Sequence, residues 1–146
     1  MKLTGNIIFI TGGGSGIGRG LAEAFHRLGN QVIIAGRRRD RLAATLAANP
    51  GMQSVELDIA NPDSIAVLAR QAIADFPQLN VLVNNAGIML PDDAGGSIDE
   101  AMLKATIETN LMGPIRLTSA LIDHLKAQDR ATILYVSSAL GFVPLP

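Results

Sequence analysis

The stretch Thr11–Gly18 reads TGGGSGIG, and six glycines fall within positions 12 to 20. It follows the apolar run Asn6–Thr11 (NIIFIT) and precedes apolar residues at helical spacing, so we place it between a strand and a helix. Glycines let the backbone approach a pyrophosphate, whose charge the N–H groups and positive end of the helix can meet. A merely flexible loop is the plainer alternative, although such loops rarely fall at this turn. The candidate binding residues here are Gly12, Gly14, Ser15, Gly16, Ile17 and Gly18. The spacing is T-G-x-x-x-G-x-G, and no three glycines satisfy G-x-G-x-x-G.

Further β-branched runs alternate with segments of helical periodicity along the rest of the chain. Such alternation predicts an α/β fold with a Rossmann-type, doubly wound parallel sheet of strand order 3-2-1-4-5 and right-handed crossovers. We expect residues 1–146 to form one dinucleotide-binding domain that is incomplete at its C-terminus, because no helix follows the fifth strand to cover one face of the sheet. The further predicted strands are Gln31–Gly36, Gln53–Leu57, Leu79–Asn84 and Ala131–Ser137.

Capping residues predict where two of the helices begin. In Asn61-Pro62-Asp63, an N-cap side chain precedes a proline at the first helical position and an acid in the first turn. Ser97-Ile98-Asp99-Glu100 has the form of a capping box, in which Ser97 caps the helix and Glu100 reaches back. Further along this helix, Gly113-Pro114 predicts a kink or a restart.

Composition narrows the class of protein. Apolar residues make up 48% and aromatic residues 3% of the chain, which suits a core of aliphatic strands buried on both faces. The net charge is −1, which argues against nucleic-acid binding. The N-terminal apolar run is too short for a signal or a membrane span, so we expect no membrane partner and a cytoplasmic location. No metal site is predicted, because the chain has no cysteine and His26 and His124 each lack a second ligand at useful spacing.

Arginines take the place of the acidic residue that usually ends the second strand of a dinucleotide-binding fold. That acid holds the 2′-hydroxyl of NAD, and here the sequence is Ala35-Gly36-Arg37-Arg38-Arg39. A carboxylate would repel a 2′-phosphate, whereas a guanidinium donates paired hydrogen bonds to it. Arg37 and Arg38 therefore favour NADP over NAD. The alternative is that these arginines are only solvated at the start of the next helix and pair with Asp40.

These motifs resemble the short-chain dehydrogenase/reductase family, and the resemblance covers the whole chain. The glycine stretch corresponds to the family's first signature, Asp58 with Ile59 to the acidic position after the third strand, and Asn84–Gly87 to its N-N-A-G. Asn110 in ETNLMGP matches the asparagine of the long fourth helix. Ser138 in VSSALG matches the catalytic serine, judged by the S-x-x-G that follows. The FPQLNVL and GFVPLP stretches also resemble the DltE-type oxidoreductase branch.

The resemblance implies roles for these residues in an NADP-dependent oxidoreductase that moves a hydride between NADP(H) and a carbonyl or alcohol. Asp58 would accept from the adenine amino group, and Asn85, followed by Ala86 and Gly87, would border the adenosine ribose. Asn110 would bend the helix and anchor a water in the proton path, and Ser138 would polarise the substrate carbonyl.

The roles implied for Asp58, Asn85 and Asn110 have plainer competitors in local structure. Asp58 also suits a strand-end cap, and Asn84-Asn85 suits a turn. Asn110 also suits a buried asparagine with satisfied hydrogen bonds. For Asp58 we favour the functional interpretation.

The family's general acid is a tyrosine in a Y-x-x-x-K pair beyond the serine, and this pair is not among the 146 residues. The single tyrosine, Tyr135, precedes Ser138 and has no lysine four positions later, so we expect a structural role for it. The chain as given is therefore expected to be inactive, with a full-length form that is a homo-oligomer. The competing hypothesis is a dinucleotide-binding module without catalysis.

Overall fold

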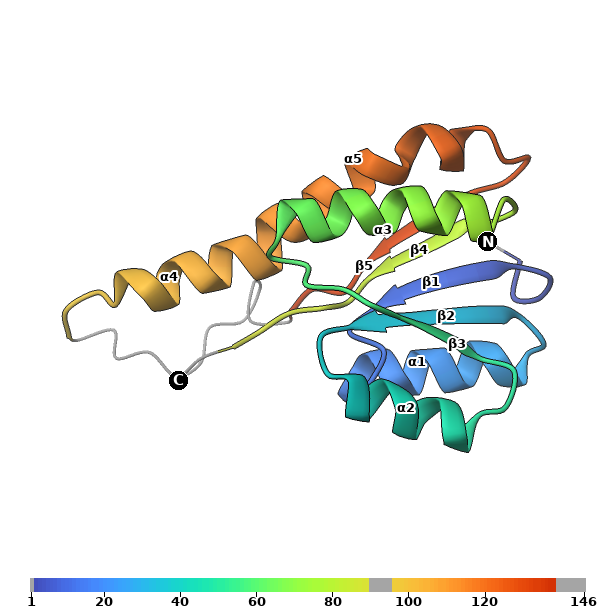
Figure 1. Ribbon diagram of the computed structural model, residues 1–146, viewed down its shortest axis with the longest axis horizontal. Coiled ribbons are helices and arrows are strands. Elements are labelled where there is room, and N and C mark those ends of the chain that lie inside the picture. The colour runs from blue at the N-terminus through green and yellow to red at the C-terminus, as the bar shows by residue number, and fades with distance from the viewer. Residues whose placement is uncertain (1, 90–95, 139–146) are drawn as a thin grey trace.

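A single parallel sheet organises the chain. The computed structural model describes residues 2–89 and 96–138. Its strands lie in the order β3-β2-β1-β4-β5, and every neighbouring pair is parallel (Figure 1). This confirms the predicted fold and strand order. Most strands are slightly shorter than the sequence pattern predicted. Their bounds are β1 Ile7–Thr11, β2 Gln31–Gly36, β3 Gln53–Glu56, β4 Val81–Asn84 and β5 Thr132–Tyr135.

Helices cover both faces of the sheet (Figure 1). Helices α1 (Gly16–Arg27) and α2 (Arg39–Ala48) lie on one face, and α3 (Pro62–Asp75) and α5 (Gly113–Lys126) lie on the other. Helix α4 (Glu100–Ile107) projects beyond the carboxyl ends of the strands and continues into α5. The carboxyl edge of the sheet is thus bordered by the start of α1 and by the long α4–α5 segment.

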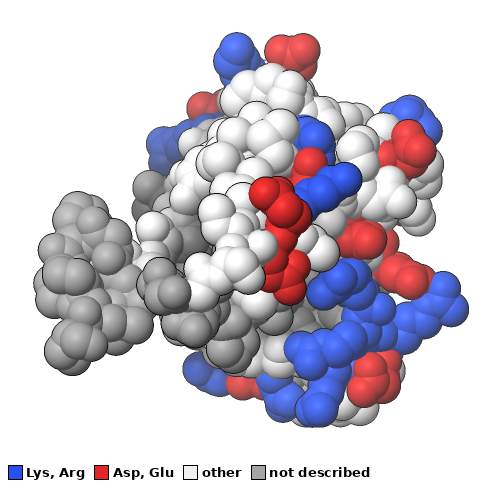
Figure 2. All heavy atoms as spheres, turned by 90° about the vertical axis from the view of Figure 1, so that its left-hand side faces the viewer, with Lys and Arg blue, Asp and Glu red and all other residues white. Residues whose placement is uncertain are grey.

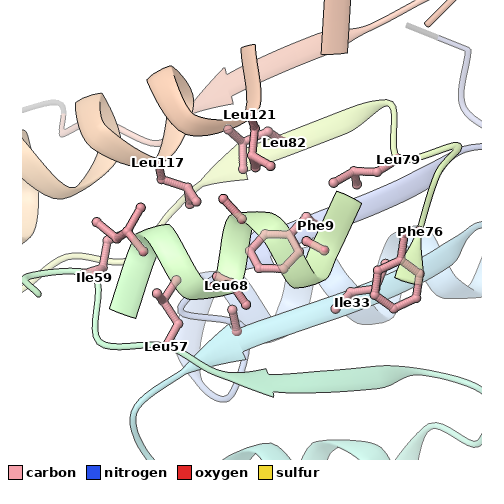
Figure 3. Packing of buried hydrophobic residues seen from close by; sticks show 14 of the residues in the cluster. Phe9, Ile33, Leu57, Ile59, Leu68, Phe76, Leu79, Leu82, Leu117 and Leu121 are labelled. Carbon is pink, nitrogen blue, oxygen red and sulfur yellow. The ribbon is translucent and has the colours of Figure 1, made fainter. Parts of the chain in front are cut away.

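Two aliphatic clusters hold these layers together. Between the sheet and α3 and α5, Phe9, Leu82 and Leu117 are fully buried and pack in one cluster (Figure 3). On the opposite face, Ile8 and Val32 pack with residues of α1 and α2. Each such buried side chain contributes about 1.5 to 3 kcal/mol by leaving water. Because successive residues of β1 alternate between the two clusters, this strand is buried on both faces, as the composition predicts.

The starts of two helices test the capping predictions. Asn61 caps α3 as predicted, since its Oδ1 accepts from the N–H groups of Asp63 at 2.9 Å and Ser64 at 3.2 Å. The prediction that Ser97 caps α4 is wrong. Asp99 takes that place, and its Oδ1 accepts from the N–H groups of the second and third residues that follow it, at 2.9 and 3.0 Å. A carboxylate one residue before the helix accepts hydrogen bonds from these N–H groups. Its negative charge is also stabilised by the positive end of the helix dipole.

Three asparagines tie together the amino ends of β1, β2 and β4. Asn30 Oδ1 accepts from the backbone N–H of Asn6 at 3.0 Å and from its side-chain amide at 2.9 Å. The Asn30 amide donates to Leu3 O at 2.8 Å and to Phe25 O at 2.9 Å. Asn80 joins the cluster by donating to Asn6 Oδ1 at 3.1 Å. Because Asn6 and Asn30 are buried, these hydrogen bonds replace water that cannot reach them.

We predict that Asn30→Ala lowers the free energy of unfolding by about 2 to 4 kcal/mol, because it removes the acceptor of the buried Asn6 N–H and the side-chain donor to Leu3 O and Phe25 O. The control is Gln31→Ala, since the exposed Gln31 side chain forms a hydrogen bond with the exposed Gln53. Urea unfolding measures both variants. A loss for Asn30→Ala no larger than for the control would show that the asparagine cluster is not stabilising.

Candidate functional site

A pocket of about 350 Å³ opens at the carboxyl edge of the sheet. Its walls come from the β1–α1 loop, the end of β2, the segment after β3 and the segment after β4. In the order β3-β2-β1-β4-β5, the chain adds β2 and β3 on one side of β1 and then adds β4 and β5 on its other side. Ligands of open α/β sheets bind outside the carboxyl ends of the strands at such a switch point. The pocket therefore lies where the fold favours a ligand.

The backbone of the glycine stretch lies against the end of β4. Gly12 has a φ of 71°, and a Cβ built on it would lie 2.8 Å from Asn85 Nδ2. A Cβ on Gly18 would lie 2.3 Å from the same atom and 2.4 Å from Gly12 O. No side chain fits at either position without moving its neighbours. Glycine is thus required here by close packing, so the merely flexible loop is not what the structure has.

Thr11 and Asn85 fix this arrangement by hydrogen bonds. Thr11 Oγ1 accepts from the N–H groups of Asn85 and Ala86, both at 3.0 Å, and Asn85 Nδ2 donates to Thr11 O at 2.9 Å. In the described structure Asn85 therefore joins β4 to the glycine stretch. Asn85 also lines the pocket.

Basic side chains gather on the side of the molecule where the strands have their carboxyl ends (Figure 2). Arg37 and Arg38 line the pocket, and Arg38 Nη2 donates to Ser15 Oγ at 2.8 Å across its rim. Arg39 instead forms an ion pair with Glu56 at the end of β3, outside the pocket lining. Arg41 lines the pocket and lies 3.7 Å from Asp40. The arginine run is thus divided between the pocket and surface ion pairs.

Asp58 does not line the pocket. Its Oδ1 accepts from the N–H of Ala60 at 3.1 Å, and its own N–H donates to Ser64 Oγ at 3.2 Å. These bonds order the turn between β3 and α3. They correspond to the strand-end cap that the sequence offered as an alternative role for Asp58. Its neighbours Leu57 and Ile59 are buried and give the pocket an apolar wall.

The two residues matched to catalytic positions lie outside the pocket lining. Asn110 is exposed and holds the backbone of Ile88, accepting its N–H at 2.8 Å and donating to its carbonyl at 2.7 Å. Ser138 is exposed and follows β5 at the same edge of the sheet. Tyr135 lies in β5 with its hydroxyl 2.7 Å from Thr118 Oγ1. Gly141, at the end of the S-x-x-G pattern, lies outside the described residues.

The structure brings most of the predicted binding residues into one pocket. Those that line it are Gly12, Gly14, Ser15, Gly16, Ile17, Gly18, Arg37, Arg38, Ile59, Asn85, Ala86 and Gly87. Sequence reasoning missed further lining residues, which are Thr11, Ala35, Gly36, Arg41, Leu42, Leu57, Ile88 and Thr109. Most of these directly adjoin a predicted residue, so proximity to the motifs was the available signal. Arg41 and Leu42 reach the pocket only because the first turn of α2 packs against the glycine stretch.

The described residues contain neither a metal-binding cluster nor a membrane-spanning helix. No group of three or more His, Asp or Glu side chains within residues 2–89 and 96–138 is placed to hold a metal ion. Over the same ranges, no helix is both long and apolar enough to cross a membrane.

Comparison with known proteins identifies relatives over nearly the whole chain. Residues 6–146 match the family described as short chain dehydrogenase. The uncharacterized oxidoreductase DltE of Bacillus subtilis is 40% identical over 146 residues, which cover 99% of this chain and 58% of that protein. L-fucose dehydrogenase of Bos taurus is 30% identical over 97% of this chain and 52% of that protein. These shares show that the chain spans about half the length of such relatives.

Solved structures agree with the sequence comparison. A metagenomic short-chain oxidoreductase in complex with NADP is 31% identical, with a TM-score of 0.88 over 98% of this chain and 66% of that one. A short-chain dehydrogenase from Streptomyces avermitilis is 32% identical, with a TM-score of 0.84 over 91% of this chain and 49% of that one. The resemblance first seen in the glycine, N-N-A-G and serine motifs is confirmed, and the chain belongs to the short-chain dehydrogenase family of oxidoreductases.

Proposed function

We propose that this chain binds NADP(H), in preference to NAD(H), for hydride transfer to or from a small carbonyl or alcohol substrate. The observation that carries the proposal is the pocket at the β1–β4 switch point, where glycines leave space for a ligand and Arg37 and Arg38 lie at the rim. The relative solved with NADP bound has the same fold and supports this choice of cofactor. When bound, NADPH supplies the hydride, and the residues described here hold and orient it.

The residues present fit three parts of such a cofactor, namely its diphosphate, its 2′-phosphate and its adenine. The N–H groups at the start of α1 and the positive end of that helix suit a diphosphate beside Gly14–Gly18. Arg37 and Arg38 suit a 2′-phosphate, since a guanidinium donates paired, charge-assisted bonds to phosphate oxygens. The apolar wall of Leu42, Leu57 and Ile59 suits an aromatic base. Asp58 remains a proposed partner of the adenine amino group at the edge of this wall.

Ser138 and Asn110 are proposed to act at the other end of the site. The Ser138 hydroxyl would orient the substrate oxygen, and Asn110 would support the proton relay. The family's Y-x-x-x-K pair is not among these 146 residues, so proton transfer requires such a pair from outside them. A binding module without catalysis is the alternative. NADPH oxidation by a form that carries the pair, with any of a panel of carbonyl compounds, would exclude that alternative.

We predict that the double variant Arg37→Ala/Arg38→Ala weakens NADPH binding by about ten- to a hundredfold, because the 2′-phosphate loses its charge-assisted hydrogen bonds. NADH, which lacks that phosphate, should bind the variant within about twofold of its original affinity. Fluorescence titration with both cofactors measures these affinities.

The matched control is Arg39→Ala, because Arg39 pairs with Glu56 and does not line the pocket. It should leave both affinities within about twofold, as expected for an exposed ion pair. Tighter binding of NADH than of NADPH by the unmodified chain would contradict the proposal. Equal losses for Arg39→Ala and the double variant would also contradict the assigned roles.

We predict that Gly18→Ala lowers both thermal stability and NADPH affinity, the latter by at least about tenfold, because the new methyl group displaces Asn85 and Gly12. Gly20→Ala is the control, since a Cβ on Gly20 meets nothing within 4 Å. That variant should be slightly more stable, by about 0.5 to 1 kcal/mol, because alanine favours the helix. Thermal unfolding and NADPH titration of both variants make the comparison, and indistinguishable variants would refute the packing argument.

A further inference from the structure

The long helix that crosses the carboxyl edge contains one wide turn. Residues Glu108–Met112 form a π-turn between α4 and α5, in which the N–H of Gly113 donates to Glu108 O, five residues earlier. Pro114 has no N–H, so it cannot donate to the carbonyl of Asn110 as a regular α-helix would require. Such single π-turns are frequent at functional sites. The sequence signal for the interruption is therefore the Gly113-Pro114 pair.

The π-turn is attached to the wall of the pocket through Asn110. The Asn110 amide pairs with both backbone groups of Ile88, at 2.8 and 2.7 Å. Ile88 and Gly87 line the pocket, and a Cβ on Gly87 would lie 3.4 Å from Asn110 Oδ1. The helix is thus hydrogen-bonded at Asn110 to this wall of the pocket.

A second attachment lies at the end of the turn. A Cβ on Gly113 would lie 2.5 Å from Ile59 O and 3.2 Å from Glu108 O. The helix therefore packs directly on the segment after β3, which also lines the pocket through Ile59. Together the two attachments connect the π-turn to walls that follow β3 and β4.

An ion pair spans the π-turn. Arg116 Nη1 donates to Glu108 Oε2 at 2.5 Å, and each side chain is 30% exposed. In an uninterrupted α-helix, residues eight apart lie about 80° apart around the axis, because each residue advances about 100°. The extra residue of the π-turn reduces the rotation between the two residues by about one such step, so their side chains lie at nearly the same angle around the helix axis. This pairing therefore depends on the wide turn.

We propose that Glu108 and Arg116 are positioning residues, whose ion pair keeps the π-turn and thereby holds Asn110 against the pocket wall at Ile88. A straightened helix would separate the pair and withdraw Asn110 from Ile88 at the same time. The effect on binding rests on the proposed NADP function, whereas the effect on the Ile88 backbone does not.

The first test measures hydrogen exchange of the Ile88 amide in the ligand-free chain. Glu108→Gln and Arg116→Gln should each speed this exchange by about three- to tenfold relative to the amide of Ile33 in the core, because the lost ion pair loosens the acceptor at Asn110. The charge-swapped variant Glu108→Arg/Arg116→Glu should return the ratio to within about twofold. The control Arg19→Gln removes the Arg19–Glu23 ion pair on α1 and should leave the ratio unchanged.

The second test compares two ligands in the same variants. NADPH affinity should fall by about three- to tenfold in the single variants and recover in the swap. The affinity for 2′,5′-ADP should stay constant, since it carries only the adenosine half of the cofactor. An unchanged Ile88 ratio, or a swap that fails to restore it, would overturn the proposal. If the unmodified chain bound neither ligand, the NADP function would fail while the exchange ratio still decided the role of the ion pair.

Discussion

The structure depends on the close approach of the glycine stretch to the end of β4. Without side chains at Gly12 and Gly18, the backbone lies against Asn85, where a Cβ would come within 2.8 and 2.3 Å of its amide nitrogen. The hydrogen bonds between Thr11 and Asn85 keep these two segments together. As a result the start of α1 lines a pocket at the switch point of the sheet, where an anion is favoured.

The fold places the neighbouring arginines after β2 in two different environments. Arg39 is paired with Glu56, whereas Arg37 and Arg38 remain at the pocket rim. Together with the positive end of α1, they are the features on which the proposed binding of NADP rests. On the far side, the π-turn reaches the same pocket through Asn110 and Ile88. The site is thus held between the first crossover of the sheet and the long helix at its edge.

The sequence predicted those features that local patterns determine. The alternation of β-branched runs and helical periodicity was sufficient for the strand order, and the glycine stretch with the motifs after β2, β3 and β4 indicated part of the pocket lining. The sequence did not predict that Asp99 replaces Ser97 as a cap, because both residues satisfy the local pattern and only the helix start decides between them. The ion pairs Arg39–Glu56 and Arg116–Glu108 depend on tertiary geometry and on a π-turn, respectively. Neither can be read from residue spacing.

A crystal structure of the chain grown with NADP would test the central claim most directly. The account predicts the diphosphate at the start of α1, beside Gly14–Gly18, and the 2′-phosphate within hydrogen-bonding distance of Arg37 or Arg38. A pocket closed by protein, or an adenosine half bound away from these arginines, would contradict it.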